Sequence, residues 1–262
     1  MKNLKHYFIL NCSVLLMLGV SIPLLAQGQQ KESLVGWWTF DPGKELKDLT
    51  GNFADLTLNG AKVAKGNLDV DDGTWAVTNK YSGPDFSEKT MVSWAILQSL
   101  DVKGGSILTT QPVAPGQFHF DSIDFGERQN HRWCMGSGWF NRTQDFDPGF
   151  EEKKAGELIQ MAISFEDDGG NAHIIGYRNG EVIGEYTFGP IVLLKKSDTQ
   201  VIFGTRWSND GNPVDFVDAL IEDARIYKVV LSQKEIKTLQ PNTTPVETLD
   251  KLSTLWGAIK AN

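Results

Sequence analysis

Short runs of alternating apolar and polar residues extend from Leu34 to about Leu239, separated by Gly, Asp and Asn. Alternation over about four to eight residues is typical of half-buried strands, and no stretch shows the roughly 3.6-residue period of a long helix. Roughly a dozen short strands without crossover helices predict an all-β fold of two packed antiparallel sheets. Five of these predicted strands are residues 35–41, 55–59, 74–78, 90–97 and 201–206.

Three segments in the middle of the chain predict an antiparallel meander. Residues 158–165 and 172–178 flank an Asp-Asp-Gly-Gly-Asn loop, and Asn179-Gly180 joins the second segment to residues 181–188. Asn-Gly is the pair preferred by two-residue hairpin turns with positive φ.

The last predicted strand, residues 218–227, carries both acids and an arginine. Successive residues of a strand point to opposite faces of the sheet. One face is therefore predicted to carry Leu220, Glu222, Ala224 and Ile226, and the other Ile221, Asp223, Arg225 and Tyr227.

A short helix is predicted to follow this strand. Ser232 can accept a hydrogen bond from a first-turn amide, and Glu235, three residues later, can complete a capping box. Leu231 before the cap and Ile236 after it are spaced to form a hydrophobic staple. The predicted fold is thus all-β with one short C-terminal helix.

The two ends of the 262-residue chain differ in composition from the middle. Lys2 and Lys5 precede an apolar run over residues 7–25 and a small residue, Ala26, which together predict a signal peptide over residues 1–26. An uncleaved membrane anchor is the alternative. Residues 27–33 are a predicted linker, residues 34–241 the domain, and residues 242–262 a linker and short apolar tail that contains Trp256.

Charge and cysteine content limit the possible partners. The signal carries two Lys and no acid, so its removal takes the net charge from −8 to −10. Such a balance disfavours nucleic acid and anionic membrane surfaces. Cys12 would leave with the signal, and Cys134 would have no disulfide partner. The exported domain must then be held together by its hydrophobic core.

Several short motifs follow one another in a characteristic order. They are Leu34-Val-Gly-Trp-Trp-Thr-Phe-Asp41, Asp48-Leu-Thr-Gly-Asn52, Thr57-Leu-Asn-Gly60, Met91-Val-Ser-Trp-Ala95, Tyr177-Arg-Asn-Gly180 and the closing strand with its helix. This order resembles the laminin G-like and concanavalin A-like lectin-glucanase jelly-roll family, although Trp94 and Ala95 stand in swapped order. The resemblance implies a jelly-roll sandwich, a fold that hosts lectins, adhesive modules and glycosidases alike.

One segment bears on catalysis. Asp121-Ser-Ile-Asp124-Phe-Gly-Glu127 is similar to the E-x-D-x-x-E strand of the glucanases, but Ser122 stands where the family has its nucleophilic Glu. Asp121 is one position too early and is predicted to face the other side of the sheet. Asp124 and Glu127 are then expected to be loop and strand-edge acids, and no catalytic residue is predicted.

Candidate ligand-binding residues gather in two loops rich in Trp and Arg. Indole rings stack on the apolar faces of sugars, and Arg and Asn can bind hydroxyls or carboxylates, so an acidic or sulfated glycan is one expected ligand. The alternative is that the Trp residues belong to the core and the Arg residues are ordinary surface charges. The candidates are Arg128, His131, Arg132, Trp133, Trp139, Asn141, Arg142, Arg206 and Trp207.

The resemblance also suggests a structural calcium ion, which needs converging oxygen ligands. Asp41 ends the first strand and Asp223 lies in the last, and these strands are neighbours in related jelly rolls. The resemblance therefore makes these two carboxylates candidates to share an ion. Alternatively, Asp223 pairs with Arg225 or another cation and Asp41 caps a turn.

The resulting functional hypothesis is an exported binding module, secreted or located in the periplasm or cell envelope. It is expected to recognise carbohydrate or a cell-surface or matrix component without catalysis, and to have no membrane span after signal cleavage. A divergent glycoside hydrolase or lyase is one alternative. A structural module that binds another envelope protein is the second.

Overall fold

The computed structural model describes residues 31–114, 119–209 and 212–242. By its internal contacts the chain divides into residues 1–33 and a compact unit from Leu34 onward, which is the part considered below. The predicted signal peptide and the tail with Trp256 lie outside the described residues. Within the described residues no helix is long and apolar enough to cross a membrane.

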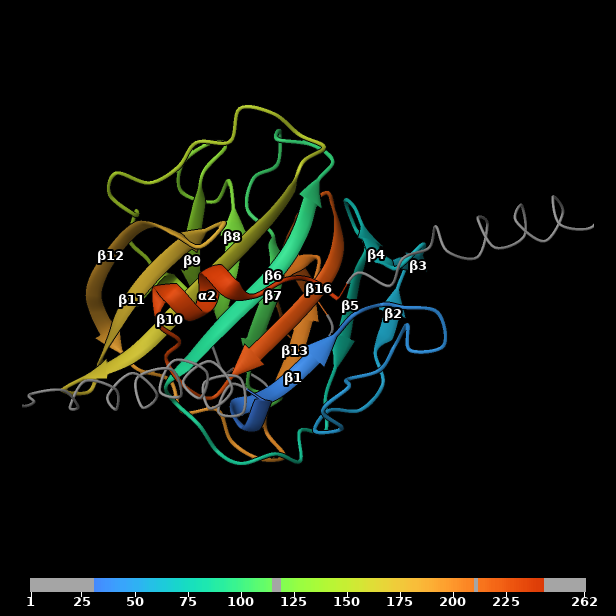
Figure 1. The fold of residues 1–262 in the computed structure, drawn as a ribbon, viewed down its shortest axis with the longest axis horizontal. Helices are drawn as coiled ribbons and strands as arrows, with labels where there is room; N and C mark the ends of the chain where they lie inside the picture. The colour runs from blue at the N-terminus through green and yellow to red at the C-terminus, as the bar shows by residue number, and fades with distance from the viewer. Residues whose placement is uncertain (1–30, 115–118, 210–211, 243–262) are drawn as a thin grey trace, which may run out of the picture. The chain divides into compact units, whose positions relative to one another are not determined.

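The predicted all-β sandwich with a short C-terminal helix is confirmed (Figure 1). The larger sheet contains β1 (Leu34–Trp38), β3 (Lys62–Ala64), β4 (Asn67–Val70), β6 (Lys89–Leu97), β10 (Leu158–Asp168), β11 (Asn171–Arg178), β12 (Glu181–Pro190) and β16 (Ala219–Tyr227). Its order is β12-β11-β10-β6-β16-β4-β3, and β1 also pairs with β16.

The smaller sheet faces the larger one across the core. It contains β2 (Thr57–Asn59), β5 (Trp75–Thr78), β7 (Ser106–Gln111), β8 (Asp121–Phe125), β9 (Trp133–Ser137) and β13 (Gln200–Phe203), in the order β2-β5-β13-β7-β8-β9. A separate hairpin joins β14 (Thr205–Asn209) to β15 (Asn212–Phe216). One 3-10 turn, η1 (Gly138–Phe140), follows β9.

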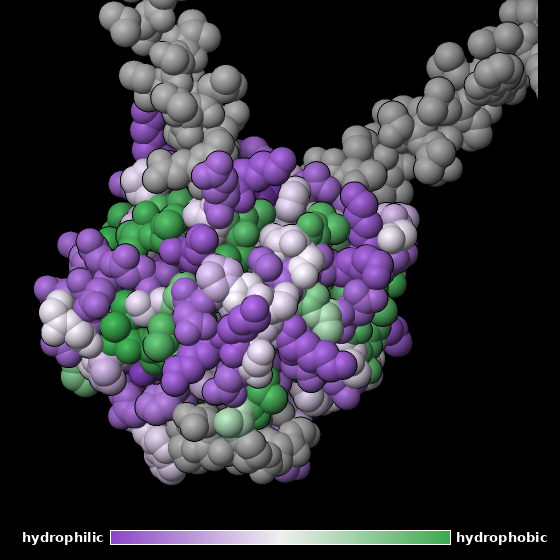
Figure 2. Space-filling view, turned by 90° about the horizontal axis from the view of Figure 1, so that it is seen from below, coloured by the Kyte–Doolittle hydropathy of each residue, from purple (hydrophilic) through white to green (hydrophobic). Residues whose placement is uncertain are grey.

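The core between the sheets is rich in aromatic rings. Trp38 is fully buried, and its ring centroid lies 5.5 Å from that of Phe53 and 5.4 Å from that of Phe203. Tilted and edge-to-face contacts of this kind add to the free energy of burial. On the face shown in Figure 2, apolar residues form separate patches among polar ones.

The predicted meander is confirmed. β10, β11 and β12 pair antiparallel in sequence order. Asn179 and Gly180 form the turn between β11 and β12, with φ values of 51° and 74°. Both residues thus occupy the left-handed region that this turn requires.

The alternation predicted for the last strand is interrupted. The pairing of β16 with β6 shifts register between Ile221 and Asp223, which marks a β-bulge at Glu222. The prediction that Ile221 shares a face with Asp223 is therefore wrong, because the extra residue turns the strand over. The side chains that β16 contributes to the core are those of Ala219, Ile221, Ala224 and Ile226.

The predicted capped helix is α2 (Gln233–Thr238), and both hydrogen bonds of its capping box are present. It lies over the outer face of the larger sheet (Figure 1). The predicted staple residues Leu231 and Ile236 belong to a second buried cluster there, together with Trp94 and Tyr177. Because a helix this short is marginal alone, this packing stabilises it.

Candidate ligand-binding site

The segment that follows β9, residues 138–150, runs along the edge strand of the larger sheet. The Gly149 amide donates to the Ile183 carbonyl at 2.9 Å, and the Gln144 amide donates to the Tyr186 hydroxyl at 3.2 Å. A Cβ atom added at Gly189 would overlap the Asn141 carbonyl, so the 138–150 loop touches β12 closely. The loop therefore connects an edge of one sheet to an edge of the other.

Two adjacent aromatic residues protrude from this loop. Trp139 is 77% exposed and Phe140 is 46% exposed. Each has a φ of 55°, a region that bulky residues seldom occupy and that costs on the order of 1 kcal/mol. We call Trp139 and Phe140 the aromatic pair. These exposed rings contribute little to the core, and the strained turn holds both of them at the surface.

The residues around the aromatic pair fix its position. The Ser137 hydroxyl accepts a hydrogen bond from the Arg142 amide at 2.9 Å and bonds the Thr143 hydroxyl, also at 2.9 Å. The Asn141 amide donates to the Gly138 carbonyl at 3.1 Å. The turn is thus held at both ends, which favours a preformed surface.

An ion pair borders the aromatic pair. The Arg128 guanidinium lies 5.7 Å from the ring centroid of Phe140. Its Nε donates to Asp145 Oδ1 at 2.7 Å and its Nη2 to Asp145 Oδ2 at 3.4 Å. These hydrogen bonds lower the pKa of Asp145, so its carboxylate stays charged. Phe140 and Asp145 were not among the predicted site residues, although the two consecutive aromatic residues are visible in the sequence.

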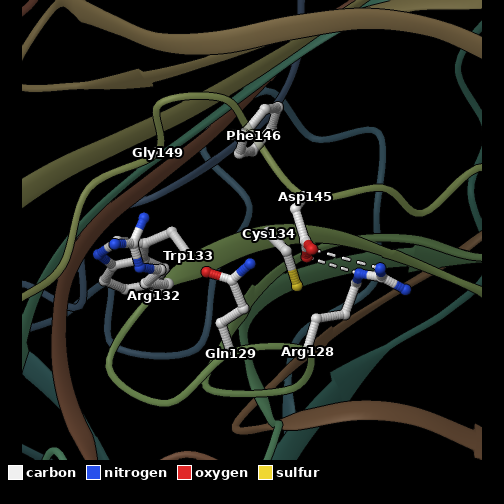
Figure 3. Close-up of a pocket in the computed structure, with 8 residues that line it drawn as sticks. All are labelled: Arg128, Gln129, Arg132, Trp133, Cys134, Asp145, Phe146 and Gly149. Carbon is white, nitrogen blue, oxygen red and sulfur yellow. Dashed lines mark hydrogen bonds and ion pairs between the residues drawn. The ribbon is translucent and has the colours of Figure 1, made fainter.

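A small pocket adjoins this ion pair (Figure 3). The Arg128–Asp145 pair stands at one side of it and Arg132 at the other. Burial raises the pKa of the Cys134 thiol well above its usual value, so this cysteine remains protonated. The pocket is lined by Arg128, Gln129, Arg132, Trp133, Cys134, Asp145, Phe146 and Gly149.

Two of the predicted binding residues lie inside the sandwich. Trp133 is 3% exposed, and its indole nitrogen donates to Glu152 at 2.8 Å. Arg142 is 1% exposed, and its guanidinium donates to Asp121 at 2.9 Å and to the Phe120 carbonyl at 2.8 Å. The Trp133 indole and the Arg142 guanidinium find their hydrogen-bond partners in the interior, as buried polar groups need to. Neither side chain therefore reaches the surface.

The other predicted residues lie in different places. Arg132 and Asn141 lie with Arg128 and Trp139 at the 138–150 loop, where Arg132 donates to the Pro148 carbonyl at 2.9 Å, whereas the His131 ring lies 3.6 Å from Asp101. Arg206 and Trp207 lie on β14. The Trp207 ring stacks on Phe120, with centroids 6.1 Å apart.

Of the two acids predicted for loops and strand edges, Glu127 lies in the loop after β8 as predicted, but Asp124 does not. Asp124 lies within β8 and is fully buried, so its prediction as a loop or edge acid is wrong. Ile123 and Phe125 point into the core, which puts Asp124 and Ser122 on the opposite face. The hairpin of β14 and β15 lies over this face, where the Arg206 backbone carbonyl accepts a hydrogen bond from the Thr109 hydroxyl at 2.8 Å.

The buried carboxyl of Asp124 has an unusual electrostatic environment. Burial raises its pKa to about 7, and the Ser122 hydroxyl and the Arg206 guanidinium offset this only in part. Neither carboxyl oxygen has a hydrogen-bond partner of regular geometry among the described residues. Glu127 is also largely buried and pairs with Arg206. Neither acid is open to a polysaccharide in this conformation.

Asp121, on the other face of β8, anchors a buried ionic group. Lys89 Nζ lies 2.8 Å from Asp121 Oδ2, and Arg142 binds Oδ1. Burial opposes ionisation, but Arg142 and Lys89 together lower the pKa of Asp121. This arrangement holds the Arg142 guanidinium inside the protein.

The predicted calcium ligands Asp41 and Asp223 share a partner, although Asp41 lies in the loop after β1, which ends at Trp38, and not at the end of the strand as predicted. The Asn242 side chain donates to Asp41 and its backbone amide to Asp223, both at 2.8 Å. Arg225 donates to both oxygens of Asp223, at 2.9 and 2.8 Å. These two carboxylates therefore fit a calcium ion poorly, because a guanidinium already supplies the positive charge. The residues described contain no cluster of three or more His, Cys, Asp or Glu suited to a metal ion.

Comparison with known proteins gives a family match. Residues 69–237 match a laminin G-type family model described as the concanavalin A-like lectin/glucanases superfamily. No curated protein matches the sequence at a significant level.

Solved structures share the fold at low sequence identity. Domain 4 of AbnA, a GH43 extracellular arabinanase from Geobacillus stearothermophilus in complex with arabinotriose, is 21% identical with a TM-score of 0.52, over 78% of this chain and 97% of that one. The Trypanosoma rangeli sialidase in complex with 2,3-difluorosialic acid is 14% identical with a TM-score of 0.56, over 83% of this chain and 34% of that one.

A botulinum neurotoxin type C chain, for which cell entry depends on two ganglioside molecules, is also similar. It is 14% identical with a TM-score of 0.56, over 80% of this chain and 51% of that one. The chain thus spans about a third of the sialidase and about half of the toxin chain. Identities this low establish a common fold and not a common ligand.

Proposed function

Because the chain belongs to the concanavalin A-like lectin/glucanases superfamily, we propose that it is an exported module that binds carbohydrate without cleaving it. The observation that carries this proposal is the aromatic pair, whose rings are exposed on a strained and anchored turn. Aromatic rings combine a large apolar face with low conformational freedom, so they stack well on the C–H faces of sugars.

The polar groups beside the rings supply the directional part of recognition. Arg128 and Asp145 offer hydrogen-bond donors and acceptors within one fixed pair, and the exposed Asn141 follows Phe140 directly. A few polar groups beside an apolar platform are typical of small-molecule sites. The AbnA domain, in complex with arabinotriose, and the ganglioside-dependent toxin support a glycan as the class of ligand.

Export rests on the predicted signal peptide over residues 1–26, with the extracellular arabinanase as a parallel. The hydrolase alternative gains no support, because Asp124 is enclosed and Glu127 is paired with Arg206. Binding of an envelope protein through residues 242–262 remains a separate proposal that concerns a segment mostly outside the described residues.

The test is glycan binding by the wild type and Trp139→Ala, with release of reducing sugar measured in parallel. Removing a ring at the centre of a binding surface typically costs about 2 kcal/mol, which weakens binding roughly 30-fold. Val182→Ala is the matched control, because Val182 is also an exposed apolar residue. It lies at the start of β12, whereas Asn141, next to the aromatic pair, contacts Gly189 near the end of that strand.

Binding that survives Trp139→Ala would remove the aromatic pair from the site. Sugar release that disappears in Asp124→Asn or Glu127→Gln would instead support the hydrolase alternative. Absence of any glycan signal, with capture of a protein partner that depends on residues 242–262, would favour the interaction module.

A further inference from the structure

The pairing of arginines with carboxylates near the aromatic pair bears on which glycans the site accepts. The sequence made Arg128, Arg132 and Arg142 candidates for binding an acidic or sulfated glycan. In the structure each of them has a carboxylate partner. Arg128 is bound by Asp145, Arg142 is buried against Asp121, and Arg132 lies 3.9 Å from Glu151.

Arg206, in the hairpin of β14 and β15, is also paired with carboxylates. Arg206 pairs with Glu127 and lies 2.7 Å from Asp215. Each arginine of the predicted site therefore has a carboxylate beside it. Over residues 127–154 the sequence contains three Arg and two Lys against five acids, so this segment has no excess of positive charge; the acids are Glu127, Asp145, Asp147, Glu151 and Glu152.

An anionic sugar would meet two obstacles beside the aromatic pair. Its sulfate or carboxylate would either replace the hydrogen bonds of 2.7 and 3.4 Å that Arg128 gives to Asp145 or accept from the remaining N–H groups of the same guanidinium. In either position it would share Arg128 with the Asp145 carboxylate, and like charges at this range repel. A hydroxyl meets neither obstacle, because it can donate to Asp145 and accept from Arg128 while the pair stays together.

We infer that the site formed by the aromatic pair, Arg128 and Asp145 selects uncharged sugars and discriminates against sulfated and uronic-acid glycans. This inference rests on the proposed carbohydrate-binding function. Asp145 acts as the discriminating residue, because its carboxylate already compensates the charge of Arg128 and repels a second anionic group beside it. The rings supply affinity, and the ion pair supplies orientation through neighbouring hydroxyls.

The experiment uses the full chain and two sets of probes. Laminarin, dextran, arabinan and galactomannan are neutral, whereas polygalacturonate, dextran sulfate and heparin are anionic. Affinity electrophoresis and calorimetry would be run at low and high salt. At least one neutral polysaccharide should bind, with a Kd that changes less than about twofold with salt, because no ionic contact is made. Every anionic probe should bind at least about tenfold more weakly.

Asp145→Asn is the decisive variant, because it keeps the shape of the side chain but removes the charge that occupies Arg128. It should gain about tenfold in affinity for an anionic probe at low salt, and high salt should abolish the gain. Asp147→Asn is the matched control. It removes one charge from the same loop and leaves the Arg128–Asp145 pair intact, so its gain should be much smaller.

The outcomes separate this inference from the proposed function. Tighter binding of an anionic than of a neutral probe by the wild type, lost in Trp139→Ala, would overturn the neutral-sugar inference and keep the binding site. An Asp145→Asn variant with a native melting curve but no gain for anionic probes would also overturn it. If no probe binds, or binding is unaffected by Trp139→Ala, the proposed function fails and the inference fails with it.

Discussion

The buried carboxyl of Asp124 should make the stability of the protein depend on pH in an unusual direction. Most carboxyls in folded proteins have ordinary or lowered pKa values and stabilise the fold as pH rises from acid. Asp124 is fully buried in β8, and burial raises its pKa from 3.8 to about 7. The folded protein therefore holds this proton over a range in which the unfolded chain releases it.

The difference between the folded and unfolded pKa values of Asp124 sets the direction and the size of its effect on stability. The contribution of Asp124 is most favourable below pH 4, where both states are protonated, and it is lost progressively as pH rises towards about 7. The whole difference corresponds to roughly 4 kcal/mol, at about 1.4 kcal/mol for each pKa unit. Asp124→Asn removes the ionisable group with little change in shape. The variant should therefore be similar to the wild type in acid and more stable than it above neutrality.

Urea denaturation of both proteins from about pH 4.5 to pH 8.5 measures the effect directly as a difference in free energy of unfolding. Asp145→Asn serves as the control, because this carboxyl is partly exposed and hydrogen bonds from Arg128 lower its pKa. Its difference from the wild type should not grow in favour of the variant as pH rises. A difference between Asp124→Asn and the wild type that stays within about 1 kcal/mol over the whole range would refute the reasoning. It would mean that the carboxyl is solvated or paired in the folded state.

Four further changes test other parts of the structure. Asp121→Asn leaves the buried Lys89 and Arg142 without their counter-ion, so it should destabilise the fold by about 3–5 kcal/mol in urea denaturation at neutral pH. Ser232→Ala removes the side-chain oxygen of the capping box and should cost about 1 kcal/mol in the same measurement, whereas Lys234→Ala, inside α2, should cost much less. Gly180→Ala puts a Cβ at a φ of 74° and 2.8 Å from the Lys237 Cα, so it should lower the melting temperature, with Gly169→Ala, which has open space, as the milder comparison. Calcium chloride at about 5 mM should raise the melting temperature by less than about 1 °C, and a larger rise that Asp41→Asn abolishes would restore the calcium site between Asp41 and Asp223.

The parts of the fold that were predictable from the sequence are those decided by nearby residues. The Asn179-Gly180 turn and the Ser232–Glu235 capping box each depend on the chemistry of a few consecutive residues, and both are present. The bulge at Glu222 is different. It arises where β16 pairs with β6, more than a hundred residues earlier in the chain, and alternation within one strand carries no information about it.

The candidate binding residues also show that local sequence does not determine which side chains are exposed. Trp133 and Trp139 stand six positions apart in one Trp- and Arg-rich segment, yet one is 3% and the other 77% exposed. Trp133 lies on a strand facing the core, whereas Trp139 lies on a turn fixed by Ser137 and by contact with β12. Composition identifies such a segment as a candidate, but only the pairing of distant strands decides which rings reach solvent.

The sequence also contains the acids that pair with these arginines, but the Trp- and Arg-rich segment alone gives no indication of them. The arginines of residues 128–142 suggest an anionic ligand only while the acids around them are ignored, and over residues 127–154 five acids balance three Arg and two Lys. Folding then brings each arginine to a carboxylate, Arg128 to Asp145 at the surface and Arg142 to Asp121 inside. Because an ion pair presents donors and acceptors side by side with little net charge, its natural complement is a pair of hydroxyls. The same pairing that makes the segment a poor site for sulfated glycans therefore makes it a suitable one for neutral sugars.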